Sequence, residues 1–394
     1  MDPAEVLQYI DPETIARDTL DFVQVKSETG DEGAGSAFLA DLLRREGFAV
    51  EIEEVEPGRP NVYALVEGNG KGGERDLLFN GHTDTIPIGQ SAPPERAGDW
   101  IIGRGTEDMK GGLVAMVHAA AALRRAGVSL QGNLWLTGVV GHETPAGKKE
   151  GPKRLIEHLR SGRMRAQGIL IVEGPCAIWA ASLGTAIFTV KISTGRGPIH
   201  TIKVPYEENP ALWAGKLLTE FQHLERAFDA APHHPLCGRE IINVGMVHGG
   251  DYFNRLPTSM TITGSRRWTP GKTLEDVRAQ LQEVCDRLAT ASGLAFEIEL
   301  QAAREPFETP ADHALVRALQ AAGREAAGQT PELIGMGLAG DANLYFNEGD
   351  VTTVYYGPAH ETAHSDHERV AISQLAHCAR IYALAAMNFC GVVR

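Results

Sequence analysis

Histidine, aspartate and glutamate recur along the chain where apolar, strand-like runs end. The segments are LLFNGHTD with His82 and Asp84, GRGTEDMKGG with Asp108, VVGHET with His142 and Glu143, VEGP with Glu173, and AHETAHSDHE with His360, His364 and His367. One such residue is usually a helix cap or a solvated loop residue. Repetition at five strand ends indicates a metal site, because loops at the carboxyl ends of parallel strands meet at one edge of a sheet. Nitrogen and oxygen donors without thiolates suit Zn²⁺, Mn²⁺ or Co²⁺.

The neighbouring His142 and Glu143 do not begin a zinc-protease helix of the HExxH type. Position 146 is Ala where the second histidine would stand, and Pro145 would fall inside the helix. The pair is therefore expected in a loop that follows a strand.

The composition is that of a globular protein with an acidic surface. The chain has 394 residues, 43% of them hydrophobic, and a net charge of 37 − 51 = −14. This charge argues against nucleic acid or an anionic membrane as a partner. Five scattered cysteines, no apolar leader and no apolar run long enough to span a bilayer predict a cytoplasmic protein with reduced thiols.

Two kinds of element order divide the chain. Residues 1–183 and 307–394 alternate strands and helices, which predicts a three-layer α/β domain with a mostly parallel sheet. A helix is expected to begin at Asp11 and Pro12, and a final one from 367. Residues 184–306 follow a β-α-β-β-α-β order, which predicts a ferredoxin-like domain inserted into the first.

The motifs GHTDTIP, GRGTEDMKGG, VVGHET, VEGP and AHSDHE occur in one order along nearly the whole chain. Together they resemble the aminoacylase, acetylornithine deacetylase, succinyl-diaminopimelate desuccinylase and glutamate carboxypeptidase family of dinuclear-metal amidohydrolases. The resemblance implies two divalent ions, with Zn²⁺ preferred over Mn²⁺ or Co²⁺. It implies five metal ligands: His82 and Glu173 on one ion, Glu143 and His364 on the other, and Asp108 between them. Asp84 is then expected to hold the second ring nitrogen of His82.

The resemblance also assigns residues of the inserted domain. His200 is expected to reach across a homodimer, formed through this domain, and to stabilise an oxyanion in the neighbouring site. Asn254 and Arg267 are expected to hold a substrate carboxylate, a task that suits the guanidinium fork. Arg266 next to it leaves the choice of arginine open. Gly337 opens GLAGDAN, which is either a substrate loop or a tight turn that starts a helix.

The sequence departs from the family pattern at His142, where the resembling enzymes carry a glutamate that acts as general base. A shift of register would make Glu143 the base and leave Thr144 as a poor ligand, so we keep Glu143 as the ligand. An imidazole can act as a base, but the site loses one negative charge.

The predicted function is hydrolysis of an amide bond in an N-acyl amino acid, a peptide-like compound or a related small carboxylate. It would proceed through a water shared by the two metals, with His142 as the base. Two alternatives stay open. One is a hydrolase of an unusual non-peptide amide or aryl-amine bond. The other is a non-catalytic metal-binding or scaffold protein. A separate alternative for His142 is that it only packs at the end of a strand.

Overall fold

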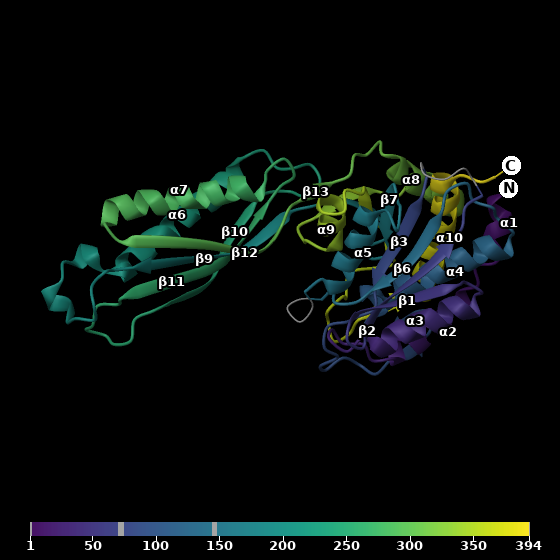
Figure 1. Ribbon diagram of the computed structural model, residues 1–394, viewed down its shortest axis with the longest axis horizontal. Coiled ribbons are helices and arrows are strands. Elements are labelled where there is room, and N and C mark those ends of the chain that lie inside the picture. The colour runs from purple at the N-terminus through teal and green to yellow at the C-terminus, as the bar shows by residue number, and fades with distance from the viewer. Residues whose placement is uncertain (1, 70–74, 144–147, 394) are drawn as a thin grey trace. The chain divides into compact units, whose positions relative to one another are not determined.

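The structure is a computed structural model that describes residues 2–69, 75–143 and 148–393. It divides into two compact units (Figure 1). Unit 1 comprises Met1–Ala180, Thr309–Ile334 and Leu344–Arg394, and unit 2 comprises Ala181–Glu308 and Gly335–Asn343. The expected insertion, 184–306, lies within unit 2. The segment 335–343, which the sequence placed with the catalytic domain, packs with unit 2.

A nine-stranded sheet organises unit 1. Its strands are β1 (Val50–Glu56), β2 (Arg59–Val66), β3 (Leu77–His82), β6 (Leu134–Val139), β7 (Gly168–Ile171), β8 (Ile178–Ser182), β13 (Phe307–Glu308), β14 (Leu333–Met336) and β15 (Thr353–Tyr355). Of these, strand β13 and the last residues of β8 and β14 belong to unit 2. The order is β1-β2-β6-β3-β7-β15-β8-β13, with β14 paired to β8. The central strands β6, β3, β7 and β15 are parallel, and antiparallel pairs flank them. The α/β class with a largely parallel central sheet is confirmed.

Helices cover this sheet. They are α1 (Pro3–Leu7), α2 (Pro12–Gln24), α3 (Gly33–Arg45), α4 (Gly111–Arg125), α5 (Glu150–Ser161), α8 (Ala314–Ala327), α9 (Asp341–Asn347) and α10 (Ile372–Cys390). Figure 1 shows β3 and β6 between α5 on one side and α4 and α10 on the other. A small antiparallel sheet holds β4 (Glu95–Ala97), β5 (Trp100–Ile102) and β16 (Arg369–Ala371).

Local sequence signals explain several boundaries. Asp11 caps α2 by accepting hydrogen bonds from the backbone N–H groups of Glu13 and Thr14, as predicted. The final helix begins at Ile372 rather than 367, because residues 369–371 pair with β5 as strand β16. The Gly pair that opens α4 does allow a close backbone approach. A Cβ on Gly112 would lie 1.8 Å from the carbonyl oxygen of Val172.

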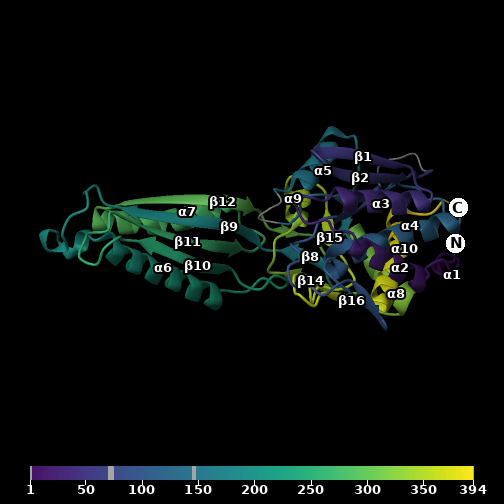
Figure 2. The ribbon, with the colours of Figure 1, turned by 90° about the horizontal axis from the view of Figure 1, so that it is seen from below.

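Unit 2 is the expected ferredoxin-like unit. It consists of β9 (Gly184–Ser193), α6 (Pro210–Ala230), β10 (Ile241–Gly249), β11 (Ser259–Trp268), α7 (Leu274–Ser292) and β12 (Ala295–Arg304). The antiparallel sheet has the order β10-β11-β9-β12, and both helices lie along one of its faces (Figures 1 and 2). Strand β9 alternates between buried and more exposed residues, because only one face meets the helices.

Within the described residues, no helix combines the length and apolar character needed to cross a membrane.

Candidate metal centre

Four neighbouring strand ends carry the candidate ligands of unit 1. His82 ends β3, Glu143 follows β6, Glu173 follows β7, and the loop with His360 and His364 follows β15. These are the four parallel strands at the centre of the sheet, so their carboxyl ends face the same edge.

Asp108 reaches the same edge by another route. It lies between β5 of the small sheet and the start of α4. The expectation of five strand ends of one sheet was therefore wrong in this respect, because the second motif belongs to a loop that the small sheet and α4 hold in place.

The carboxylate of Asp108 lies between two imidazoles. Its Oδ1 is 2.9 Å from Nε2 of His82, and its Oδ2 is 3.1 Å from Nε2 of His364. The same Nε2 of His364 lies 2.9 Å from Oε1 of Glu143. The structure thus gives each carboxylate oxygen of Asp108 a different histidine, and these histidines were assigned to different metal ions. This is the arrangement that a bridging carboxylate requires.

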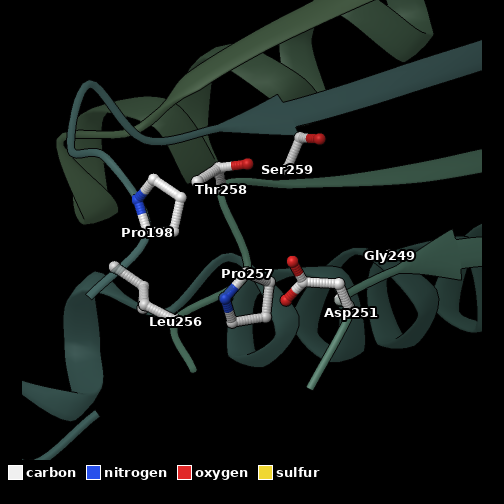
Figure 3. A pocket seen from close by; sticks show the side chains of 8 residues that line it. Pro198, Gly249, Asp251, Leu256, Pro257, Thr258 and Ser259 are labelled. Atoms are coloured by element: carbon white, nitrogen blue, oxygen red, sulfur yellow. The ribbon is translucent and has the colours of Figure 1, made fainter. Parts of the chain in front are cut away.

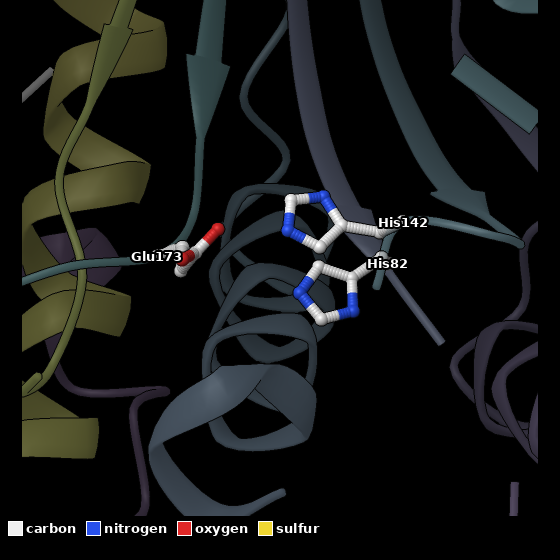
Figure 4. Close-up of side chains that lie close together, drawn as sticks. All are labelled: His82, His142 and Glu173. Carbon is white, nitrogen blue, oxygen red and sulfur yellow. The ribbon is translucent and has the colours of Figure 1, made fainter. Parts of the chain in front are cut away.

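Two further groups of donor atoms surround Glu173. His82, His142 and Glu173 offer ligand atoms that all lie within 4.8 Å of one another, and so do Asp108, Glu173 and His360. Figure 4 shows the carboxylate of Glu173 beside the rings of His82 and His142. The two rings are stacked, with centroids 4.0 Å apart and an angle of 5° between their planes. His142 therefore faces the candidate metal site instead of packing away from it.

His360 is a candidate that the sequence analysis did not select from the histidine-rich loop. Its Nε2 lies 3.9 Å from Oε1 of Glu173. The cluster of three histidines was visible in the sequence. Which of them could bind a metal could not be decided without their positions in space. His367, the third of them, is exposed.

Asp84 does more than orient His82. The Nδ1 of His82 lies 2.8 Å from the backbone carbonyl oxygen of Asp84, which the ring can reach as a donor, and 3.5 Å from Oδ1 of its carboxylate. That carboxylate accepts hydrogen bonds from the backbone N–H of His142 at 3.1 Å and of Glu143 at 2.9 Å. Asp84 thus holds the loop that carries the candidate base and the candidate ligand. The Gly/Pro turn expected at 144–147 lies outside the described residues.

Glu368 holds the Asp108 loop in a similar way, and the sequence analysis did not identify it. One oxygen accepts the backbone N–H groups of Gly105, Glu107 and Asp108 at 3.0, 3.0 and 3.1 Å. The other accepts Nη1 of Arg104 at 2.8 Å. Burial raises the pKa of Glu368, while the N–H donors oppose this shift. Its only sequence signal was its place in the quoted motif AHSDHE.

The charges of the site favour cations. Hydrogen bonds with Asp108 and Glu143 raise the pKa of His364 to about 10. Burial opposes a charge on His82, but contacts with Asp108 and Asp84 outweigh it and hold the pKa of His82 well above its usual value. Burial would raise the pKa of Asp108, yet His364 and His82 hold it well below the usual range. Buried carboxylates and imidazoles without thiolates form a donor set that fits divalent metals of the zinc type.

The predicted substrate residues Asn254, Arg267 and Gly337 all lie in unit 2, and together with His200 they form two pairs. Nδ2 of Asn254 lies 3.3 Å from Nε2 of His200, whose side chain is exposed. Nη1 of Arg267 donates to the carbonyl oxygen of Gly337 at 2.7 Å. Arg266 is fully buried and pairs with Glu240, so Arg267 is the arginine that could meet a ligand.

The loop that starts at Gly337 leads into α9, which begins at Asp341. The second alternative for GLAGDAN, a turn that starts a helix, therefore describes the end of this segment. A separate cavity of about 220 Å³ in unit 2 is lined by Pro198, Gly249–Asp251 and Leu256–Ser259, and it contains none of the predicted substrate residues (Figure 3).

The fold and the donor set define a class: an α/β enzyme with a candidate metal centre at the carboxyl edge of its sheet. The model of peptidase family M20/M25/M40 matches residues 78–388, and the chain belongs to this family. The resemblance inferred from the motifs is thereby confirmed, as is the prediction of a hydrolase.

Two curated relatives span nearly the whole chain. The N-formyl-4-amino-5-aminomethyl-2-methylpyrimidine deformylase of Bacillus subtilis (strain 168) is 25% identical over 386 residues, which cover 90% of this chain and 88% of that protein. The succinyl-diaminopimelate desuccinylase of Methylorubrum extorquens (strain PA1) is 28% identical over 388 residues, which cover 91% and 94%.

Solved structures share the fold. The aminopeptidase PepT from Bacillus cereus ATCC 10987 matches with a TM-score of 0.80 and 20% identity, over 97% of this chain and 99% of that one. The YXEP protein of Bacillus subtilis, described as a dinuclear metal binding peptidase, matches with a TM-score of 0.73 and 16% identity, over 97% and 99%.

Replacing Glu368 by Gln should destabilise unit 1. An amide offers one acceptor oxygen, so it must abandon either the three N–H groups or Arg104, and a buried charge then lacks its partner. Breaking a buried pair in this way costs about 3 kcal/mol. Chemical denaturation of Glu368→Gln beside Glu361→Gln, an exposed glutamate of the same loop, measures the difference. Equal free energies of unfolding for the two variants would contradict the role of Glu368.

Proposed function

We propose that this protein is a metal-dependent hydrolase that cleaves an amide bond of an N-acyl amino acid or a related small carboxylate at a centre of two divalent ions, with Zn²⁺ the preferred ion. The observation that carries the proposal is the Asp108 carboxylate, whose two oxygens face His82 and His364 separately. His82, Asp108, Glu143, Glu173 and His364 would hold the ions, and His360 is a further candidate ligand. The family and the dinuclear peptidase of the same fold support two ions.

The bound ions would polarise the amide carbonyl and provide an ionised water at neutral pH. The residues of the chain have the remaining tasks. Asp84 and Glu368 hold the loops of Glu143 and Asp108, so that the donor atoms keep their spacing without rearrangement. The imidazole of His142, beside His82 and Glu173, would accept the proton of the attacking water and return it to the leaving amine.

The substrate class rests on unit 2 and on the relatives. Arg267, whose Nη1 donates to the carbonyl oxygen of Gly337, would bind a carboxylate, with Asn254 as a second polar contact. The names of both relatives describe the removal of an acyl group from nitrogen. The name of the deformylase places the formyl group on a pyrimidine that carries an amino and an aminomethyl group, and a non-peptide amide of this kind is the second candidate substrate.

The homodimer formed through unit 2, with His200 completing the site of the partner, remains a prediction. The exposed side chain of His200 and its contact with Asn254 are compatible with it. Light scattering on the purified chain decides the question, and a monomer at working concentration would exclude this role of His200.

The two-metal centre can be tested by metal content. Protein purified without chelator should carry about two divalent ions per chain, and Asp108→Asn should lose at least one, since an amide is a poor bridge. Inductively coupled plasma mass spectrometry measures this, with the exposed Asp312→Asn as a control of equal charge change. Fewer than about one ion in the parent, with no gain in activity on adding Zn²⁺, Mn²⁺ or Co²⁺, would refute the centre.

The role of His142 can be tested with His142→Ala and His142→Glu on a panel of N-acyl amino acids and aryl amides. A general base predicts that the Ala variant loses about 10²- to 10⁴-fold in kcat at unchanged metal content. Loss of metal affinity instead would make His142 a ligand, a role that its place beside His82 and Glu173 also permits. An Ala variant as active as the parent removes both roles. An inactive parent whose Glu variant gains activity supports a metal-binding protein that lost its base.

A further inference from the structure

Lys110 is a buried lysine that has no carboxylate partner among the residues the structure describes. It follows Asp108 by two residues in the sequence, and it is only 1% exposed to solvent. The Nζ donates to the carbonyl oxygen of Val25 at 2.7 Å and lies 5.2 Å from the ring of Phe22. Among the described residues, no carboxylate oxygen lies within 4.0 Å of this nitrogen. Lysines are almost never fully buried unless they are paired, and one neutral carbonyl does not replace the solvation of an ammonium.

A cavity of about 220 Å³ lies beside this lysine, entirely within unit 1. Two further hydrogen-bond donors line it. Nε of Arg104 and Oγ of Ser91 are buried and have no hydrogen-bond partner among the residues that the structure describes. Arg104 is 6% exposed, and its other end is occupied by Glu368. Three buried donors thus border one cavity, and within the described part of the chain only the carbonyl oxygen of Val25 accepts from any of them.

The charge balance of the cavity selects a monoanion. Arg104 pairs with Glu368 and also lies 4.0 Å from Asp366, whereas among the described residues no carboxylate is within ion-pair distance of Lys110. Asp84 and Glu368 both lie beyond ion-pair distance of the Lys110 ammonium. One bound negative charge would supply the missing compensation. A doubly charged oxyanion would exceed it and would also meet the nearby Glu368.

The walls of the cavity select an apolar tail. Six apolar residues line it beside the three donors: Val23, Val25, Ile88, Ala92, Pro93 and Pro94. The rest of the lining is polar and includes a second lysine: Gln24, Lys26, Ser27 and Thr85. Its volume corresponds to about seven waters at roughly 30 Å³ each, which a short aliphatic chain can replace. We propose that this cavity binds a small aliphatic monocarboxylate, with its carboxylate on Lys110, Arg104 and Ser91 and its chain against the valine and proline walls.

This site is separate from the metal centre. None of the side chains that line it is a candidate metal ligand. The proposal therefore does not rest on the proposed hydrolase function, although Lys110 belongs to the segment that carries Asp108. An occupant would be held against the base of that loop, on the side of α2, whose last turn supplies Val23 and Gln24.

Isothermal titration calorimetry with propionate, in a buffer free of other carboxylates and of phosphate, tests the proposal on the protein as purified and again after metal removal. We expect one site per chain that persists without metal. Lys110→Met should weaken it more than about tenfold, since removing one partner of a buried pair is costly. Lys191→Met, an exposed lysine of β9, is the matched control and should bind as the parent does. Inorganic phosphate, the second arm, should bind more than about tenfold more weakly.

A second variant guards against a folding defect. Ser91→Leu adds an apolar side chain to the lining of the cavity and leaves Lys110 in the chain, and it should abolish propionate binding at an unchanged melting temperature. Lys110→Met should not lower the melting temperature, because it removes an uncompensated buried charge. The proposal is overturned if propionate shows no saturable binding and the cavity holds only water, or if Lys110→Met binds as tightly as the parent. It is equally overturned if metal removal abolishes binding while Ser91→Leu leaves it intact.

Discussion

The contact of the Asp108 carboxylate with two imidazoles is the constraint around which unit 1 is arranged. His82 and His364 approach it from distant parts of the chain, at 2.9 and 3.1 Å, and Glu143 and Glu173 lie in the same small volume. Buried carboxylates repel one another unless positive charge is near. The sheet can bring them together only because the imidazoles, and the cations that such a donor set selects, lower the free energy of the assembled site.

The acidic residues of this region have two distinct tasks. Asp108, Glu143 and Glu173 direct oxygens into the site. Asp84 and Glu368 instead accept backbone N–H groups, and so fix the loops on which the first group stands. A loop at a strand end leaves its N–H groups without partners, and a buried carboxylate is a strong acceptor for them. The geometry of the site is thus held by residues that do not face it.

His142 changes the chemistry of the site more than its architecture. Its ring is stacked on His82 and offers a ligand atom within 4.8 Å of those of His82 and Glu173. An imidazole in place of a carboxylate removes a negative charge and introduces a nitrogen donor. Lys110, on the other side of the Asp108 loop, is a separate consequence of the same segment, because its side chain is buried by α2.

The sequence by itself determined the α/β class, the ferredoxin-like unit and the donor types, because periodicity, caps and short motifs are local properties. Candidate ligands at His82, Glu143 and Glu173 could be recognised because each directly follows its own strand. Only the tertiary structure decided which donors meet. It set His360 beside Glu173, turned the carboxylate of Asp84 to the backbone of the next loop, and made Glu368 the support of Asp108. It also packed residues 335–343 with unit 2, where Arg267 donates to Gly337 and Asn343 donates to the carbonyl oxygen of Glu305. These pairings follow from the order of strands in the sheet, and that order is set by packing between residues far apart in the chain, which no local pattern records.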